Sequence, residues 1–274
     1  MQVQIFDVAH GFCAYVIADN GNTMLIDCGR NEETQFEPGD YLVTHSCISI
    51  ERFFVSNYDE DHLSGLPRLR ALRHRIPIQI LNRNSTITPD QLRTLKLESG
   101  PLGPGMTALL EMLRIYVAAV NTPPSYAGLE YEAFYNPYPT FTDTNNLSQV
   151  VFLHYPTVSI VFPGDLEKAG WRALMENVRF REHLSRVNIF VASHHGRESG
   201  YTEEVFEVCS PDIVVVSDEA KQYDTQETNY SVHAKGIRWS TGEVRKVLTT
   251  RSDGMIMVTA ETGQRYPYQI RTTR

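Results

Sequence analysis

Paired cysteines, long apolar runs and a surplus of basic charge are all missing from this sequence. It has four cysteines, Cys13, Cys28, Cys47 and Cys209, and none of them forms a Cys-x-x-Cys pair. A disulfide framework and a zinc knuckle are therefore not predicted, and we interpret the cysteines as small buried side chains in a reducing compartment. No apolar run approaches the roughly 18 residues of a membrane span. Because residues 1–8 alternate like a strand and not like a leader, we expect a cytoplasmic protein with no membrane contact.

The charge balance argues against a protein that coats nucleic acid. The formal net charge is -8 and the sequence pI is about 5.6, whereas extensive phosphate contacts need a basic surplus. A phosphate substrate is still possible, because local basic stretches or bound metal ions can supply positive charge. Hydrophobic residues make up 42% of the chain, enough for a sizeable core, and no shift in composition marks a domain boundary.

The most informative stretch is an apolar run that ends in acids. Residues 53–55 are predicted to form a short buried strand, and Asp59, Glu60, Asp61 and His62 follow within a few positions. Three carboxylates so close together repel one another unless a cation lies among them, and a divalent metal ion satisfies oxygen and nitrogen ligands together. The alternative is a solvated acidic turn that caps the next helix.

Other predicted strands also end in residues that bind metals. Residues 157–162 lead to Asp165, and residues 187–192 lead to His194 and His195. Ligands gather at the carboxyl ends of strands in sheets flanked by helices, although a lone buried histidine is usually structural. We therefore predict that four residues far apart in the sequence converge: Asp61, His62, Asp165 and His194.

The start of the chain is predicted to be a β-meander. Residues 3–8 and 13–17 have strand character, and Asn20-Gly21-Asn22 is a hairpin signal before a return strand over residues 23–26. That strand ends at Asp27, which we interpret as a turn-capping carboxylate in preference to a metal ligand. Its functional alternative is to orient a ligand. Helical spacing follows over residues 88–97 and 106–117. The aromatic segment 121–144 is either a wall facing the substrate or a plain surface connection.

Several motifs together resemble the metallo-β-lactamase superfamily. They are Leu-Ile-Asp-Cys-Gly at 25–29, Ser-Asn-Tyr-Asp-Glu-Asp-His-Leu-Ser-Gly-Leu at 56–66, Asn-Asn-Leu-Ser at 145–148, Phe-Pro-Gly-Asp at 162–165 and Ser-His-His-Gly at 193–196. The opening Phe-Asp-Val-Ala-His-Gly-Phe at 6–12 is also similar to the family's start. The resemblance covers roughly residues 3–235 and is strongest to the hydrolase domain of the DNA-uptake protein ComEC and its soluble stand-alone relatives. It implies one domain over residues 1–274, an αββα four-layer sandwich, with residues of about 236–274 as a C-terminal β extension.

The resemblance also implies a metal site. Asp61 and His62 match the pair that binds the second metal, Asp165 matches the bridging carboxylate, and His194 matches the last histidine. The first metal site would then consist of Asn57, Asp59, Asn146 and the bridging Asp165. Most relatives have a histidine where Asn57 stands, and an amide is a poorer ligand. Such an oxygen-rich set favours Mn²⁺ or Mg²⁺ over Zn²⁺, so we expect one or two divalent ions, Mn, Zn or Mg.

The mechanism implied by the family is attack by a hydroxide that the metals generate. Asp61 would bind metal and orient the hydroxide. His233 resembles a later family histidine that could protonate the leaving oxygen, or it is a surface histidine that caps a helix. The candidates for substrate contact are His195, Arg197, Lys221 and Tyr230.

Two functions from different classes follow. The first is a metal-dependent phosphodiesterase or nuclease that acts on DNA or on a small nucleotide. The second is a metal-poor scaffold that kept the fold, lost turnover and binds a protein partner or a second copy of itself. The amide at Asn57 favours the scaffold, whereas buried carboxylates such as Asp165 are costly to keep without a cation. A lactamase or thioester hydrolase is a weaker prediction, because the histidine-rich first site is missing.

Overall fold

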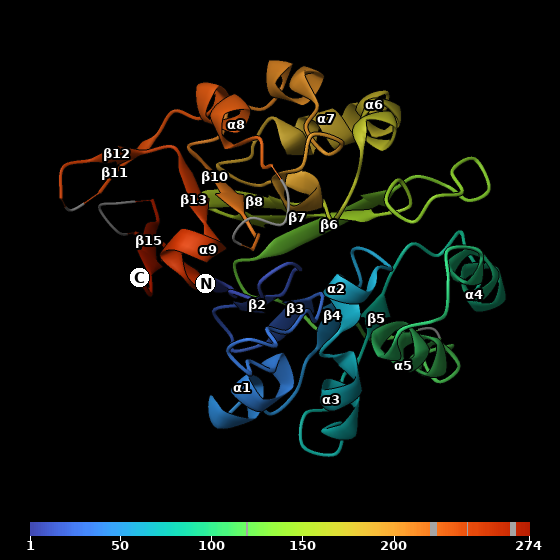
Figure 1. Ribbon diagram of the computed structural model, residues 1–274. Helices are drawn as coiled ribbons and strands as arrows, with labels where there is room; N and C mark the ends of the chain where they lie inside the picture. Colours follow the sequence, from blue (N-terminus) through green and yellow to red (C-terminus); the bar gives the residue numbers. More distant parts are fainter. Residues whose placement is uncertain (119, 220–223, 240, 264–266) are drawn as a thin grey trace.

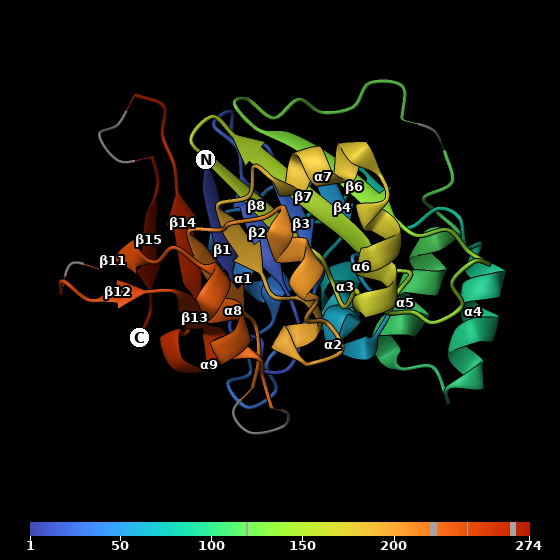
Figure 2. The same cartoon turned by 90° about the horizontal axis from the view of Figure 1, so that it is seen from above.

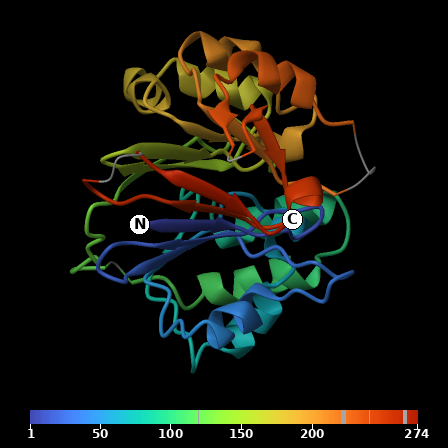
Figure 3. The same cartoon turned by 90° about the vertical axis from the view of Figure 1, so that its left-hand side faces the viewer.

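The described residues form two large β-sheets packed face to face, with helices on both outer faces (Figure 1). The computed structural model describes residues 1–274 apart from 119, 220–223, 240 and 264–266. Seen from one side, two layers of helices enclose the two sheets (Figure 3). The predicted αββα sandwich is therefore confirmed.

The first sheet contains the N-terminal meander. Its seven strands within the described residues are, from edge to edge, β15 (Gln269–Thr272), β14 (Ile256–Thr259), β1 (Gln2–Ile5), β2 (Ala14–Ile17), β3 (Thr23–Ile26), β4 (Arg52–Phe54) and β5 (Leu81–Asn82). β1, β2 and β3 are antiparallel, whereas β3, β4 and β5 are parallel. The residues before β5 do not extend it, because Pro77 has no N–H to donate and Ile78 forms only an isolated bridge to Ile50.

The second sheet carries most of the predicted strands of the second half. Its six strands in the described part are β13 (Val247–Thr249), β10 (Ile213–Val216), β9 (Ile189–Val191), β8 (Val158–Phe162), β7 (Gln149–Tyr155) and β6 (Glu130–Tyr135). Residues 236–274 also contribute the small pair β11 (Ile237–Arg238) and β12 (Val244–Arg245). This last segment supplies β13 to the second sheet and β14 and β15 to the first, so its strands complete both sheets.

Helices cover the outer face of each sheet (Figure 1). On the first sheet they are α1 (Pro38–Thr44), α2 (Glu60–Leu63), α3 (Leu66–Ala71), α4 (Pro89–Glu98) and α5 (Pro104–Leu113). On the second they are α6 (Lys168–Met175), α7 (Val178–Leu184) and α8 (Glu227–His233), with the short elements η1 (Ser193–Gly196), η2 (Glu203–Glu207) and α9 (Thr250–Asp253) nearby. The predicted helix over residues 88–97 begins with a capping box, in which Thr88 and Gln91 exchange hydrogen bonds. From above, α4 and α5 lie at the opposite end of the sandwich from β14 and β15 (Figure 2).

Three apolar cores hold these layers together. One lies between the sheets, and each of the other two lies between a sheet and its helices. β7 contributes to two of them, because Val151 and Leu153 face the other sheet while Val150 and Phe152 face the helices. Every residue of β7 is therefore buried, which explains why it reads as a continuous apolar run and not as an alternating one.

The polar residues that follow several strands lie at one edge of the sandwich. Asp27 follows β3, Asp59 begins the turn after β4, and Asp165 follows β8. His194 and His195 follow β9. Because β3 and β4 are parallel, as are β8 and β9, these segments leave their sheets at the same edge. The fold thus brings the predicted residues to one place.

No helix within the part of the chain that the structure describes combines the length and the apolar character needed to cross a membrane.

Candidate metal centre

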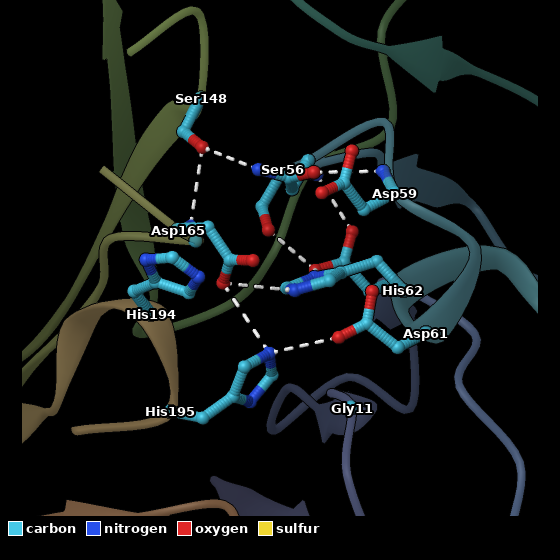
Figure 4. Close-up of polar contacts among 12 residues, drawn as sticks. Gly11, Ser56, Asp59, Asp61, His62, Ser148, Asp165, His194 and His195 are labelled. Atoms are coloured by element: carbon cyan, nitrogen blue, oxygen red, sulfur yellow. Dashed lines mark hydrogen bonds and ion pairs between the residues drawn. The ribbon is translucent and has the colours of Figure 1, made fainter. Parts of the chain in front are cut away.

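Four side chains meet at this edge of the sandwich (Figure 4). One atom each of Asp61, His62, Asp165 and His195 lies within 4.8 Å of the others, a separation that one metal ion can bridge. Three of the residues are buried, and Asp61 is intermediate. They come from α2, from the loop after β8 and from η1, so only folding brings them together.

Two glycines allow Asp61 to approach the first strands closely. A Cβ atom on Gly11 or on Gly29 would lie 2.4 Å from the carbonyl oxygen of Asp61. Gly11 also has a φ of 150°, which other residues rarely adopt. Any side chain at these two positions would push α2 away from the strands and would displace Asp61.

Asp27 fixes the orientation of His62. Its Oδ2 lies 2.7 Å from His62 Nδ1, and its Oδ1 accepts a 2.7 Å hydrogen bond from the backbone N–H of Ser56. An Nδ1–H donated to Asp27 leaves the lone pair on Nε2, which lies 3.0 Å from Asp165 Oδ1. Carboxylates commonly hold metal-binding histidines in this way. Asp27 therefore orients a candidate ligand, the functional alternative that the sequence left open, while its other oxygen holds the backbone of Ser56 and not its own turn.

His195 points a buried nitrogen at two carboxylates. Its Nδ1 lies 3.0 Å from the backbone carbonyl of Ser217, so this nitrogen carries the proton it donates. Nε2 then lies 3.1 Å from Asp61 Oδ2 and 3.4 Å from Asp165 Oδ1, and among the described residues it has no hydrogen-bond partner. A lone pair facing two carboxylates is unfavourable unless a proton or a metal cation lies between them. The two imidazole nitrogens and two carboxylates thus fit a divalent metal ion such as Zn²⁺ or Mn²⁺.

Protons balance the charge of the cluster when no metal is bound. Burial lowers the pKa of His62, but Asp165 and Asp27 outweigh it and raise that pKa well above 6.5. The pKa of His195 is raised in the same way, against burial, by Asp165 and Asp61. Burial raises the pKa of Asp61, yet the close contact with His195 and the charge of His62 lower it to about 2. A metal ion would therefore displace protons from both histidines.

This competition predicts that a bound metal stabilises the protein more as the pH rises. His62 has a raised pKa in the folded state, so its contribution to stability is complete below about pH 6.5 and is lost as the pH rises through the folded pKa. A metal ion replaces the lost positive charge. Thermal unfolding from pH 6 to pH 9, with chelator or with Mn²⁺ or Zn²⁺, should show a gap between the two midpoints that widens by several degrees. A constant or shrinking gap would contradict the assignment.

The three acidic residues after β4 make three different kinds of contact. Asp61 joins the cluster. The carboxylate of Glu60 accepts the backbone N–H groups of Gly105 and Met106 at 2.7 and 3.2 Å, and so it caps the start of α5. Asp59 is paired with a lysine, as described below. The acidic turn does not cap the next helix, because Asp59 at the start of α2 makes no side-chain capping bond, and only Asp61 of the run joins the candidate metal cluster.

The two histidines of η1 differ from the sequence prediction. His194 was predicted to join the cluster and His195 to contact substrate, but His195 occupies the cluster. His194 Nε2 accepts a 2.9 Å hydrogen bond from Arg197, and its Nδ1 lies 2.8 Å from Ser199 Oγ. Both histidines have a positive φ, 50° and 54°, and successive residues of this tight turn point in different directions. His194 lies on another side of Asp165 from His195 (Figure 4).

The predicted first metal site does not assemble as expected. Asn57 Oδ1 accepts the backbone N–H of Asp59 at 2.7 Å, and its Nδ2 donates to Ser148 Oγ at 3.0 Å. Asn146 Oδ1 accepts the backbone N–H of Gly170 at 2.8 Å. Both amides hold loops in place and have their oxygens engaged. The residues that the resemblance suggested for a first ion therefore do not fit one.

The other predicted residues are spread around the cluster. Tyr230 is not on a loop but in α8, where it is 1% exposed, so its hydroxyl does not reach a substrate in this conformation. His233 Nε2 lies 2.8 Å from Tyr201 Oη, and its ring stacks on Phe206 at 4.3 Å between centroids. The structure thus places this candidate acid in an aromatic stack. Lys221 lies outside the described residues.

Sequence reasoning missed His10. Its ring centroid lies 4.4 Å from that of His195, and its Nε2 lies 3.4 Å from Asp61 Oδ2. Arg197 donates to the same Nε2 at 2.7 Å and so links His10 to His194. Burial, with the charge of His195, lowers the pKa of His10 to about 4, so it is a neutral acceptor at neutral pH. The only sequence signal was its place beside Gly11 in the opening motif.

Comparison with known proteins shows the fold. No family model and no curated protein matches the sequence. Among solved structures, the metallo-β-lactamase fold protein YhfI from Bacillus subtilis is 8% identical, with 93% of this chain and 99% of that chain covered and a TM-score of 0.51. CmlA, a diiron β-hydroxylase from Streptomyces venezuelae, is 13% identical over 99% of this chain and 54% of its own, with a TM-score of 0.52. The chain has the metallo-β-lactamase fold, and at these identities the likeness shows the fold alone.

Proposed function

We propose that the protein is a metal-dependent hydrolase that cleaves phosphodiesters. The observation that carries the proposal is the cluster of Asp61, His62, Asp165 and His195, in which two imidazole nitrogens are directed at two carboxylates. A divalent cation held there would activate a water molecule and would draw electron density from a phosphoryl oxygen. The order of the strand-end motifs, which resembles that of the ComEC-like branch, supports the same reaction class.

The residues of the cluster would divide the work. Asp165 is the more buried carboxylate, with 3% of its side chain exposed, and it lies between both histidines, so it would hold the cation. The side chain of Asp61 is 22% exposed, so it can also reach a water molecule and take up its proton. Arg197, held between His10 and His194, places a guanidinium charge at the rim for an anionic substrate.

Charge favours a small substrate over a long nucleic acid. The formal net charge of -8 opposes the many phosphate contacts of a protein that binds along DNA. A small nucleotide presents few phosphates, so a few local cations suffice. The ComEC-like motifs point instead to DNA, and we propose both as substrates to be compared, with the small nucleotide favoured.

The experiment is a hydrolysis assay on protein that is stripped with chelator and reloaded with Mn²⁺, Zn²⁺ or Mg²⁺. The panel would contain bis-p-nitrophenyl phosphate, cyclic nucleotides and single-stranded DNA. We expect hydrolysis that depends on the added metal, with a higher kcat/KM for a small nucleotide than for DNA. Tight metal binding without hydrolysis of any phosphodiester would overturn the proposal in favour of the scaffold.

A further inference from the structure

We infer that the site works with one metal ion, and that the ammonium group of Lys96 stands where the first metal of a two-metal site would be. This inference rests on the proposed function for its substrate, but its geometry is independent of it. Lys96 belongs to α4, and its Nζ lies 2.7 Å from Asp59 Oδ1. Sequence reasoning had assigned this carboxylate to the first metal.

The contacts of the Asp59 carboxylate favour a lysine over a metal ion. Thr144 donates its hydroxyl to the same Oδ1 at 2.9 Å, so that oxygen already has two donors. The side chains of Lys96 and Asp59 are 19% and 35% exposed, so the ion pair is more shielded than a surface pair. A divalent ion on this carboxylate would lie next to the ammonium and be repelled by it.

The same ion pair is tied to the metal cluster. Asp59 is the residue before α2, which carries Asp61 and His62, and its backbone carbonyl accepts the N–H of His62 at 3.1 Å. A chain of hydrogen bonds also joins the two places, from the backbone of Asp59 to Asn57, from Asn57 to Ser148 Oγ, and from Ser148 Oγ to the backbone N–H of Asp165. The residue that pairs with Lys96 is thus tied through its backbone to the loop that carries Asp165.

A fixed ammonium can do part of what a first metal does. Lys96 has three N–H donors, and the partial exposure of its side chain leaves it accessible to a ligand. It supplies a positive charge to a phosphate oxygen, although it does not activate water. Together, one metal ion and Lys96 would bind two oxygens of one phosphate group. The class of ligand that fits this pair is a phosphate ester or inorganic phosphate.

The test combines metal stoichiometry with phosphate binding, and neither measurement needs turnover. Stripped protein is reloaded with Mn²⁺ or Zn²⁺, the bound metal per chain is counted by elemental analysis, and inorganic phosphate is titrated by calorimetry. Lys96→Met removes the ammonium group, and methionine has a helix propensity close to that of lysine. The matched control is Lys235→Met, which breaks the Lys235–Asp212 ion pair of 3.1 Å outside the cluster.

We expect one metal equivalent in the wild type and in both lysine variants. Phosphate affinity should fall at least about tenfold in Lys96→Met and stay within about twofold in Lys235→Met. Asp59→Asn should also keep one equivalent, because Asp59 binds Lys96 and not a metal.

Two equivalents in the wild type, with one lost in Asp59→Asn, would overturn the inference and leave the hydrolase proposal intact. Unchanged phosphate affinity in Lys96→Met would also overturn it. If phosphate binds through Lys96 but no phosphodiester is cleaved, the proposed function fails while the inference stands.

Discussion

Asp165→Asn is expected to remove the bound metal and phosphodiester hydrolysis together. Asp165 Oδ1 lies 3.0 Å from His62 Nε2 and 3.4 Å from His195 Nε2, so a cation that binds both histidines must also meet this oxygen. Asparagine has nearly the same shape but no charge, and its amide is a poorer ligand. We expect metal affinity to fall at least about 100-fold, or about 2.7 kcal/mol, and hydrolysis to fall to background.

The fold should survive this change. The loop around Asp165 is held by its backbone N–H, which donates to Ser148 Oγ at 3.1 Å, and this bond is retained in asparagine. Calorimetric titration with Mn²⁺ and Zn²⁺, followed by the hydrolysis assay, would measure both effects. Asp40→Asn is a suitable control, because Asp40 pairs with Arg68 on the surface of α1 and α3. Metal affinity within a few-fold of the parent would remove Asp165 from the centre.

His195→Ala and His194→Ala should have very different effects on metal binding. Nε2 of His195 is directed at Asp61 and Asp165, whereas Nε2 of His194 accepts a hydrogen bond from Arg197. We expect His195→Ala to weaken metal affinity about 100-fold, and His194→Ala to weaken it less than about fivefold.

The two histidines are adjacent, so each variant is the natural control for the other. Metal titration separates them without any assay of turnover. Because His194 positions Arg197, its loss should raise KM for an anionic substrate more than it changes metal affinity. The reverse order of metal affinities would restore His194 as the ligand that the sequence suggested.

Much of the fold and part of the site follow from the sequence. Apolar runs such as residues 157–162 predicted buried strands, because a strand covered on both faces needs apolar side chains throughout. Acids and histidines directly after these runs predicted a cluster, since parallel strands end at the same edge of a sheet. Asp61, His62 and Asp165 were predicted to converge in this way, and the structure brings these three side chains together. This prediction used only the position of each residue directly after the end of a strand.

Adjacent histidines in a turn cannot be told apart by such reasoning. Strand-end position is the same for His194 and His195, and only the tertiary contacts distinguish them, since His194 contacts Arg197 and Ser199 while His195 contacts Asp61. His10 reaches the centre from the loop between β1 and β2, far from Asp61 in the sequence, and its only local signal is the glycine that follows it. Side-chain direction in irregular segments is set by packing from several parts of the chain.

The sequence by itself therefore predicted the buried strands and the edge at which their polar ends meet, because both depend on local periodicity and on the ends of strands, while the layered sandwich followed from the resemblance to a known family. Only the tertiary structure decided the composition of that centre. Lys96 pairs with Asp59 across 37 positions, from a helix that no motif connects to the site. Its ammonium changes a carboxylate that looked like a metal ligand into half of an ion pair. Contacts of this kind depend on how α4 packs beside the acidic turn, and they cannot be predicted from the spacing of residues along the chain.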